Sequence, residues 1–240
     1  MPFQPDYRHF TDVMRNVQPK RLPLYEHIIS PNVMAEILGT PFAKLAGGDE
    51  ADRAEFFRYY CRFFCEMTYD VVSYEVGITE ILPGDGALTG GRGPIQNRVD
   101  FDAYPWDDLP RLWEQCATPR LDALRAALPE GMKAVGGVGN GVFEIAEDLV
   151  GLQYLPFMQM DDPELYSDLF ARIGETMRRI WDVFLPRYAT HFVAVRFGDD
   201  LGFKASLLTN PETVRRHILP QYRHLIQRAH AAGKPLLWHS

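Results

Sequence analysis

The fold is decided by the stretch FVAVRFGDDLG, residues 192–202, together with the shorter stretch PLLWHS, residues 235–240. Each begins with an apolar run typical of a buried strand and ends in polar residues. An amphipathic helical pattern separates them, so the order is strand, acidic loop, helix, strand and polar tip. Parallel α/β proteins keep their chemistry at the carboxyl ends of their strands. Asp199, Asp200 and His239 are therefore the first candidate functional residues.

Composition narrows the classes of protein to which the chain can belong. Its 240 residues are 46% hydrophobic and 24% charged, as in an ordinary folded protein. The net charge of −7 argues against a nucleic acid partner, because neutralising phosphates requires a basic face. No apolar run approaches membrane-spanning length, and the N-terminus lacks the pattern of a signal peptide. An odd number of cysteines, three, favours a reducing setting, so we expect a cytoplasmic protein.

Strand-like and helix-like patterns alternate along the chain. The predicted strands are residues 22–29, 69–74, 133–138, 192–195 and 235–238. The predicted helices include residues 51–67, residues 109–128, a helix that begins at Asp162-Pro163 and another that begins at Asn210-Pro211. At both dipeptides an N-cap residue precedes a first-turn proline. Alternation of this kind indicates βα units and a parallel sheet, and about five units fit.

These patterns leave two architectures open. A closed eight-stranded barrel takes about 250 residues, so the sheet is either open and doubly wound or a barrel that lacks its last strands. The glycine-rich residues 84–93 lack the spacing of a nucleotide-binding loop. We interpret them as a turn or hairpin excursion, which either covers a pocket or serves only as a connection between neighbouring elements. Gly139-Asn140-Gly141 follows a predicted strand, where glycines let a ligand approach closely.

Six short motifs occur in a fixed order from residue 21 to the last residue. They are RLPLYEH (21–27), DFDAYPW (100–106), a stretch that opens with GNG (139–151), DDPEL (161–165), GDDLG (198–202) and GKPLLWHS (233–240). This ordered set resembles the uroporphyrinogen decarboxylase superfamily, an (α/β)8 barrel family. Its members include the haem-pathway decarboxylase and zinc-dependent enzymes that move methyl groups between corrinoid proteins and thiols. The resemblance implies one domain over residues 1–240, an α/β TIM-type (β/α)8 barrel cut short after about five βα units.

The haem-pathway decarboxylase is the less similar branch. After its first strand it carries the arginine-rich motif RQAGRY, where this chain has EHIISP, residues 26–31. A porphyrinogen with eight carboxylates needs arginines that bind them bidentately, and Glu26 would repel them. The nearest counterpart of the family's catalytic aspartate is Glu75, and its active-site tyrosine aligns with Glu147. Such a decarboxylase needs no cofactor.

The methyltransferase branch is more similar at the C-terminal end. There a His-x-Cys pair follows the strand that corresponds to residues 236–239, and a later cysteine completes a zinc site. A zinc-bound thiol loses its proton and attacks the methyl donor. The resemblance therefore implies His239 as a metal ligand of an incomplete zinc site, with a corrinoid protein as partner. The cysteines are not placed to complete it, and the spacing of Cys61 and Cys65 is interpreted as packing in a helix.

The candidate residues divide into expected roles. We expect Asp200, Asp199 and Glu75 to be catalytic, as acid, base or substrate ligand, although one aspartate can instead cap a turn. The expected substrate-binding residues are Glu26, His27, Asn140, Glu147 and Arg196. The alternative interpretation of such a cluster is a set of hydrogen bonds between loops. Three functions stay open: a zinc-dependent corrinoid/thiol methyltransferase-like protein, a decarboxylase of a carboxylated ring, and an inactive truncated domain.

Overall fold

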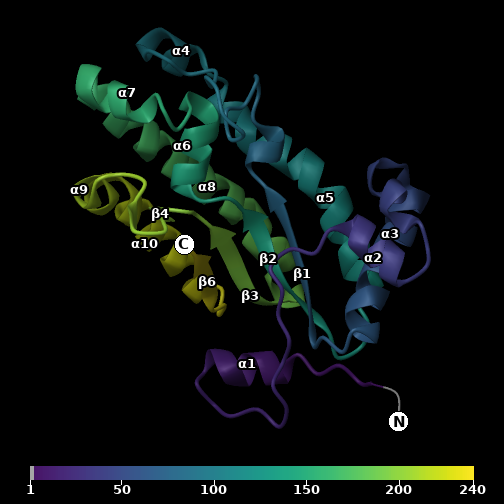
Figure 1. The fold of residues 1–240 in the computed structure, drawn as a ribbon. Coiled ribbons are helices and arrows are strands. Elements are labelled where there is room, and N and C mark those ends of the chain that lie inside the picture. Colours follow the sequence, from purple (N-terminus) through teal and green to yellow (C-terminus); the bar gives the residue numbers. More distant parts are fainter. Residues whose placement is uncertain (1–2) are drawn as a thin grey trace. The chain divides into compact units, whose positions relative to one another are not determined.

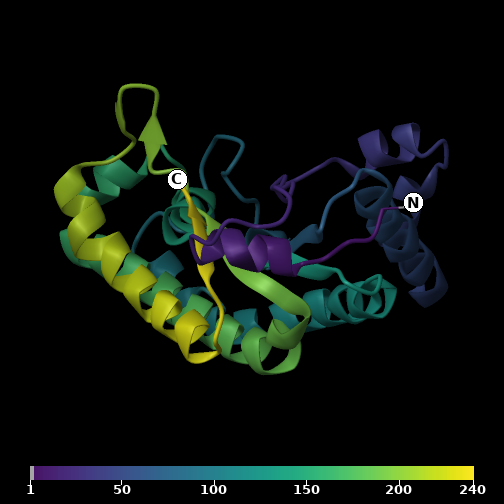
Figure 2. The ribbon, with the colours of Figure 1, turned by 90° about the horizontal axis from the view of Figure 1, so that it is seen from below.

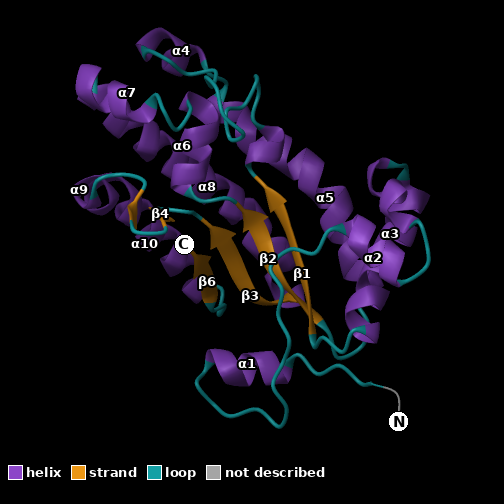
Figure 3. Ribbon diagram, in the orientation of Figure 1, coloured by secondary structure: helices purple, strands orange, loops and turns teal. Residues whose placement is uncertain are grey.

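The computed structural model describes residues 3–240 and has an α/β fold (Figures 1 and 3). Four strands form one parallel sheet in the order β1-β2-β3-β6. They are β1 (Val71–Gly77), β2 (Lys133–Gly139), β3 (Phe192–Gly198) and β6 (Leu236–His239). The predicted α/β class with a parallel sheet is confirmed, and closure into an eight-stranded barrel stays a prediction.

Ten α-helices are described, and several of them connect the strands. Their bounds are α1 (Arg8–Met14), α2 (Pro31–Ile37), α3 (Glu50–Glu66), α4 (Arg98–Ala103), α5 (Leu109–Ala127), α6 (Val142–Val150), α7 (Leu155–Asp161), α8 (Pro163–Tyr188), α9 (Pro211–Thr213) and α10 (Leu219–Ala231). Short 3-10 turns are η1 (Phe42–Gly47), η2 (Thr79–Ile81), η3 (Trp106–Asp108) and η4 (Ala189–His191), and η5 (Val214–Ile218) is a π-helical turn. A small antiparallel hairpin, β4 (Gly202–Phe203) and β5 (Ser206–Leu207), follows β3.

The starts of the two proline-led helices follow from their sequence. The side chain of Asp162 accepts a hydrogen bond of 2.8 Å from the backbone N–H of Leu165 at the start of α8. Asn210 accepts one of 2.8 Å from the N–H of Glu212 at the start of α9. Pro220 lies in the first turn of α10, directly after the π turn η5, where its missing N–H interrupts the regular helical ladder.

The strand predicted over residues 22–29 is wrong. These residues belong to no sheet. Leu22 is 78% exposed and Ile28 is 68% exposed, so the apolar side chains have no surface to bury against, and Pro23 has no N–H for a ladder. The segment is tied to β1 differently, because the hydroxyl of Ser73 donates a hydrogen bond to the carbonyl of Glu26.

The glycine-rich excursion is a loop and not a hairpin. Residues 82–97 contain no helix or strand. The loop is bonded to α6, since the N–H of Ala87 donates to the carbonyl of Asp148 at 2.9 Å. The Asp148 carboxylate also accepts from the N–H of Leu88 at 2.9 Å.

The chain divides into two compact units, and the first comprises residues up to Glu75, Gln115–Gly137 and Tyr188–Val195. Its core uses the aromatic face of α3, where the rings of Phe57 and Tyr74 meet edge to face with centroids 4.9 Å apart. A helix with this aromatic periodicity was expected from the sequence, and it is confirmed over Glu50–Glu66.

The strands of this unit approach one another closely at a glycine of β2. Gly136 has φ +128°, and a Cβ there would lie 2.3 Å from the carbonyl oxygen of Tyr74 in β1, so only glycine fits. On the other side, β2 pairs in parallel with β3, with Ala134 opposite Phe192. The register shifts by a bulge directly after this pair.

The second unit comprises Val76–Glu114, Val138–Arg187 and Arg196–Ser240. Within it α8 and α10 lie side by side (Figure 2), and Arg228 pairs with Asp182 at 2.7 Å. No helix in the part of the chain that the structure describes combines the length and the apolar character needed to cross a membrane.

Candidate functional site

Polar residues gather in the second unit where three strands end. Asn140 follows β2, Asp199 and Asp200 follow β3, and His239 is the last residue of β6. Helix α6 begins beside them at Val142. The sequence placed these residues at strand ends, and hydrogen bonds and an ion pair join them into one cluster.

Asp199 joins the ends of β3 and β6 to the start of α6. Its side chain is fully buried and accepts hydrogen bonds from the backbone N–H groups of Phe143 at 3.0 Å and Glu144 at 2.8 Å. These N–H groups belong to the first turn of a helix and otherwise lack partners. The N–H of Asp199 itself donates to the carbonyl of His239 at 2.9 Å. A Cβ at Gly141 would lie 2.2 Å from the Cβ of Asp199, which explains the glycine there.

Asp200 and His239 form a pair that is open to solvent. The Oδ1 of Asp200 lies 3.3 Å from the Nδ1 of His239, and their side chains are 62% and 57% exposed. A carboxylate at Nδ1 favours the tautomer with its proton on that nitrogen and its lone pair on Nε2. In this form the imidazole can accept a proton or bind a metal through Nε2.

Asn140 fixes the position of Glu144. Its backbone has φ +65°, a left-handed conformation that asparagine adopts more readily than most residues. Its Oδ1 accepts hydrogen bonds of 3.1 Å from both the N–H and the hydroxyl of Thr79. Its Nδ2 donates to the Oε2 of Glu144 at 3.1 Å. The amide therefore acts as a bridge between η2 and α6.

Glu144 was not among the residues selected from the sequence. A signal was available, because Glu144 and Glu147 are three residues apart in a short helix that directly follows a strand exit, and this spacing places both side chains on one helix face. Glu144 therefore joins the predicted substrate-binding residues Asn140 and Glu147 as a third candidate residue of the cluster.

Burial raises the pKa of three carboxyl groups in this cluster, those of Glu147, Glu144 and Asp199. Burial raises the pKa of Glu147 to about 7, and the nearby charges of Glu144 and Asp200 add to the rise. Burial also raises the pKa of Glu144, although its hydrogen bond with Asn140 opposes the rise. Burial raises the pKa of Asp199 to about 8 against the two backbone N–H groups that favour its ionised form. Carboxyl groups tuned in this way suit acid–base chemistry.

Arg196 lies near the end of β3 and is only 3% exposed. Its Nη2 is 3.0 Å from the place that a Cβ on Gly198 would occupy, so the guanidinium lies against the backbone at the strand exit. The expectation that Arg196 binds the substrate stays a prediction.

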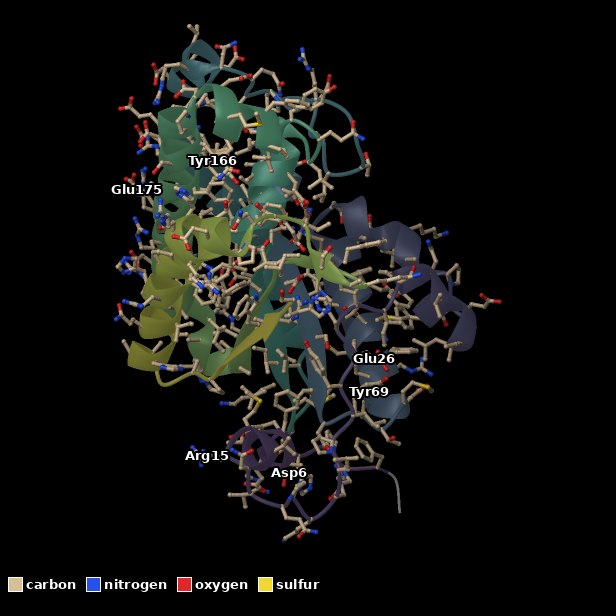
Figure 4. The ribbon with its side chains drawn as sticks, turned by 60° about the vertical axis from the view of Figure 1, so that its left-hand side comes forward. Asp6, Arg15, Glu26, Tyr69, Tyr166 and Glu175 are labelled. Carbon is tan, nitrogen blue, oxygen red and sulfur yellow. The ribbon has the colours of Figure 1, made fainter. Side chains whose placement is uncertain are left out.

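The remaining candidates lie in the first unit. The Nε2 of His27 is 3.7 Å from the Oε1 of Glu75, and their side chains are 33% and 18% exposed. Glu26 lies near Tyr69 (Figure 4), and its charge adds to the effect of burial in raising the pKa of that tyrosine. The structure therefore brings His27 and Glu75 together within this unit.

The described residues do not supply a zinc site. No group of three or more His, Cys, Asp or Glu side chains that could hold a metal ion occurs within residues 3–240. Burial raises the pKa of Cys61 to about 12 and also raises that of Cys65, which opposes the thiolate form that zinc binds. The interpretation of Cys61 as a packed helix residue agrees with its burial.

Comparison with protein-family models gives no match to this sequence, and comparison with curated proteins gives none either. The resemblance to the uroporphyrinogen decarboxylase superfamily therefore stays a prediction from the ordered motifs. The chemistry must be argued from the strand-end cluster.

Proposed function

We propose that the chain is an enzyme of the uroporphyrinogen decarboxylase superfamily that binds a small molecule where β2, β3 and β6 end. We further propose that the complete fold is a TIM-type barrel and that residues 1–240 belong to one domain of this kind. The reaction class that we propose is methyl transfer to a thiol, with a corrinoid as methyl donor. The observation that carries the proposal is the raised pKa of Glu147, about 7, near the charges of Glu144 and Asp200, the second of which pairs with His239.

A methyl transfer to sulfur needs a base. The S–H bond breaks, the sulfur forms a bond to the methyl carbon as the donor leaves with its electron pair, and one proton must be accepted. A free thiol has a pKa of about 8.5, so a carboxylate with a pKa of about 7 accepts that proton at small cost. Glu147 is the proposed base, and Glu144 is held by Asn140 beside it.

His239 is a second group that can accept a proton from the substrate. Asp200 at its Nδ1 favours the lone pair on Nε2, which can take a proton or orient a thiol. The zinc that the resemblance implies would use His239, but the described residues provide no set of three ligands, so no step is assigned to it. Zinc, when bound by a complete site, would lower the pKa of the thiol.

Decarboxylation of a polycarboxylate is the weaker candidate. The acidic side chains Glu144, Glu147 and Asp200 would repel a carboxylated ring, and each added substrate carboxylate would increase that repulsion. A neutral or cationic substrate fits this electrostatic environment better. By the same argument, a cationic thiol should be a better methyl acceptor than a neutral thiol, and a neutral thiol a better one than an anionic thiol.

The test is a methyl transfer assay with methylcobalamin as donor, with and without added zinc. Cysteamine, 2-mercaptoethanol and mercaptoacetate serve as cationic, neutral and anionic acceptors. We expect the thioether, detected by mass spectrometry, to form fastest with cysteamine, and Glu147→Gln to slow its formation at least tenfold. The matched control is Glu130→Gln, at an exposed glutamate in a turn of the first unit.

Two outcomes would overturn the proposal. One is that the folded protein forms no thioether with any acceptor between pH 6 and pH 9. The other is that the protein removes carboxyl groups from uroporphyrinogen, which would favour the decarboxylase alternative. If Glu147→Gln and Glu130→Gln were equally active, methyl transfer could stand but Glu147 would not be its base.

A further inference from the structure

A pocket of about 270 Å³ lies in the second unit between the loop at residues 92–98, α7 and the start of α8. None of the strand-end residues lines it. Its walls include two arginines, two aromatic rings and the end of α7, so it combines charge with apolar surface. Pockets of this composition are typical of small-molecule sites, although this one is at the small end of their range.

The loop that forms one wall is held in place by its own hydrogen bonds. The side-chain amide of Gln96 donates to the carbonyls of Gly93 at 3.0 Å and Val150 at 2.8 Å. The N–H of Ile95 donates to the carbonyl of Leu149 at 2.9 Å. A Cβ on Gly93 would lie 2.3 Å from the backbone of Leu149, so the loop packs directly on α6. The wall is preformed, which lowers the entropic cost of binding.

Arg92 is the cation that this wall presents. Its guanidinium stacks on the ring of Tyr154 with its carbon 4.7 Å from the centroid. Stacking fixes the plane of the guanidinium and leaves its N–H groups at the edge, where they match a carboxylate bidentately. Within residues 3–240 Arg92 has no ion pair. Arg98 differs, because it pairs with Asp168 at 2.6 Å.

Two aspartates line the same pocket, and among the described residues one of them forms no ion pair. Asp162 lines the pocket but caps α8 through the N–H of Leu165. Asp161, the last residue of α7, also lines it, and among the described residues it forms no ion pair. The pocket therefore offers one uncommitted cation, Arg92, and one uncommitted hydrogen-bond acceptor, Asp161.

The remaining wall is apolar and aromatic. Phe157 of α7 lines the pocket and is 62% exposed, so the face of its ring is accessible to a ligand. Together with Tyr154 and Met158 it forms a surface that suits a flat apolar body.

We propose that this pocket binds a small planar carboxylate that carries a hydrogen-bond donor away from its carboxyl group, as in the hydroxybenzoates and aminobenzoates. The carboxylate pairs with Arg92, the ring lies against Phe157 and Tyr154, and the donor binds Asp161. The proposal is independent of methyl transfer at the strand ends, because the two sites share no lining residue.

The test is calorimetric titration of the full chain with three probes: 4-hydroxybenzoate, benzoate, and the neutral 4-hydroxybenzyl alcohol. We expect 4-hydroxybenzoate to bind most tightly, and the neutral alcohol to bind at least tenfold more weakly because it cannot pair with Arg92. Arg92→Met should weaken binding of 4-hydroxybenzoate at least tenfold. Arg223→Met, at an exposed arginine of α10, should leave it unchanged.

Two further variants separate the contributions. Asp161→Asn should remove most of the preference for 4-hydroxybenzoate over benzoate, and Arg92→Lys should bind less tightly than the native protein because a lysine neither stacks nor binds bidentately. Thermal unfolding of each variant establishes that it is folded. The proposal is overturned if the native protein binds none of the probes, or if Arg92→Met binds 4-hydroxybenzoate as tightly as the native protein does.

Discussion

Glu147→Gln should change the pH dependence of stability in a way that can be worked from its pKa. Burial raises this pKa from the ordinary 4.5 to about 7. Between pH 4.5 and pH 7, therefore, the Glu147 carboxyl group keeps its proton in the folded protein but has lost it in the unfolded chain. The stabilisation from this group is complete below pH 4.5 and is lost as the pH rises to 7. Glutamine cannot ionise, so the variant lacks this loss.

The magnitude follows from the same rise in pKa. One pKa unit corresponds to about 1.4 kcal/mol, so a rise from 4.5 to about 7 corresponds to about 3 kcal/mol. Glu147 is only half-buried, and solvent screening reduces the value to about 1–2 kcal/mol. For a chain of this length, that difference corresponds to about 2–8 °C in Tm.

The assay is thermal unfolding of the native protein and of Glu147→Gln at pH 5 and at pH 8. The Tm of the variant relative to the native protein should be higher at pH 8 than at pH 5 by this amount. Glu130→Gln, at an exposed position, should show no such change. A Tm difference between Glu147→Gln and the native protein that stays the same at both pH values would refute the reasoning, and so would a direct titration of Glu147 by NMR that gives a pKa near 4.5.

Three further substitutions test the framework of the site by chemical or thermal unfolding. Asp199→Ala leaves two buried helical N–H groups without an acceptor and should cost about 2–4 kcal/mol, whereas Asp200→Ala at the exposed neighbour should cost less than about 0.5 kcal/mol. Gly141→Ala places a methyl group against Asp199 and should destabilise by more than about 2 kcal/mol, whereas at Gly47 an added methyl meets no atom within 4 Å and Gly47→Ala should be tolerated. Asn140→Gly accepts the left-handed backbone but loses the bonds to Thr79 and Glu144, so it should cost about 1–2 kcal/mol, and equal stability of this variant and the native protein would show that those bonds contribute nothing.

The sequence predicted the strands that are buried on both faces. β3 has no exposed residue, and β2 is buried at all but its first position, so a continuous apolar run was a sufficient signal. Residues 22–29 contain a similar run, but an apolar run alone does not show whether the fold provides a neighbouring surface against which it can be buried. In the described fold Leu22 and Ile28 remain exposed.

The sequence predicted which residues belong to the candidate site better than it predicted what each of them does. Asp200 follows β3 and His239 ends β6, and these strands are neighbours in the sheet, so the meeting of the two side chains could be inferred from topology. The expected catalytic role of Asp199 stays a prediction, whereas its burial and its two bonds to α6 agree with the alternative that one aspartate is a capping residue. This role depends on where α6 begins relative to β3, which is a distance that no local pattern contains. Glu144 was missed although its spacing from Glu147 on one face of α6 was a local signal.

The cap at the start of α6 makes the two sides of the strand-end cluster unequal. Glu144 is held twice, through its backbone N–H by Asp199 and through its side chain by Asn140. Asp200 and His239 are both more than half exposed, and their side chains can turn without breaking a buried bond. A substrate that needs more room can gain it only on the side of Asp200 and His239. Binding should therefore reshape that side first, and the choice among substrates of different size should be made there, while the side of Glu144 stays a fixed template.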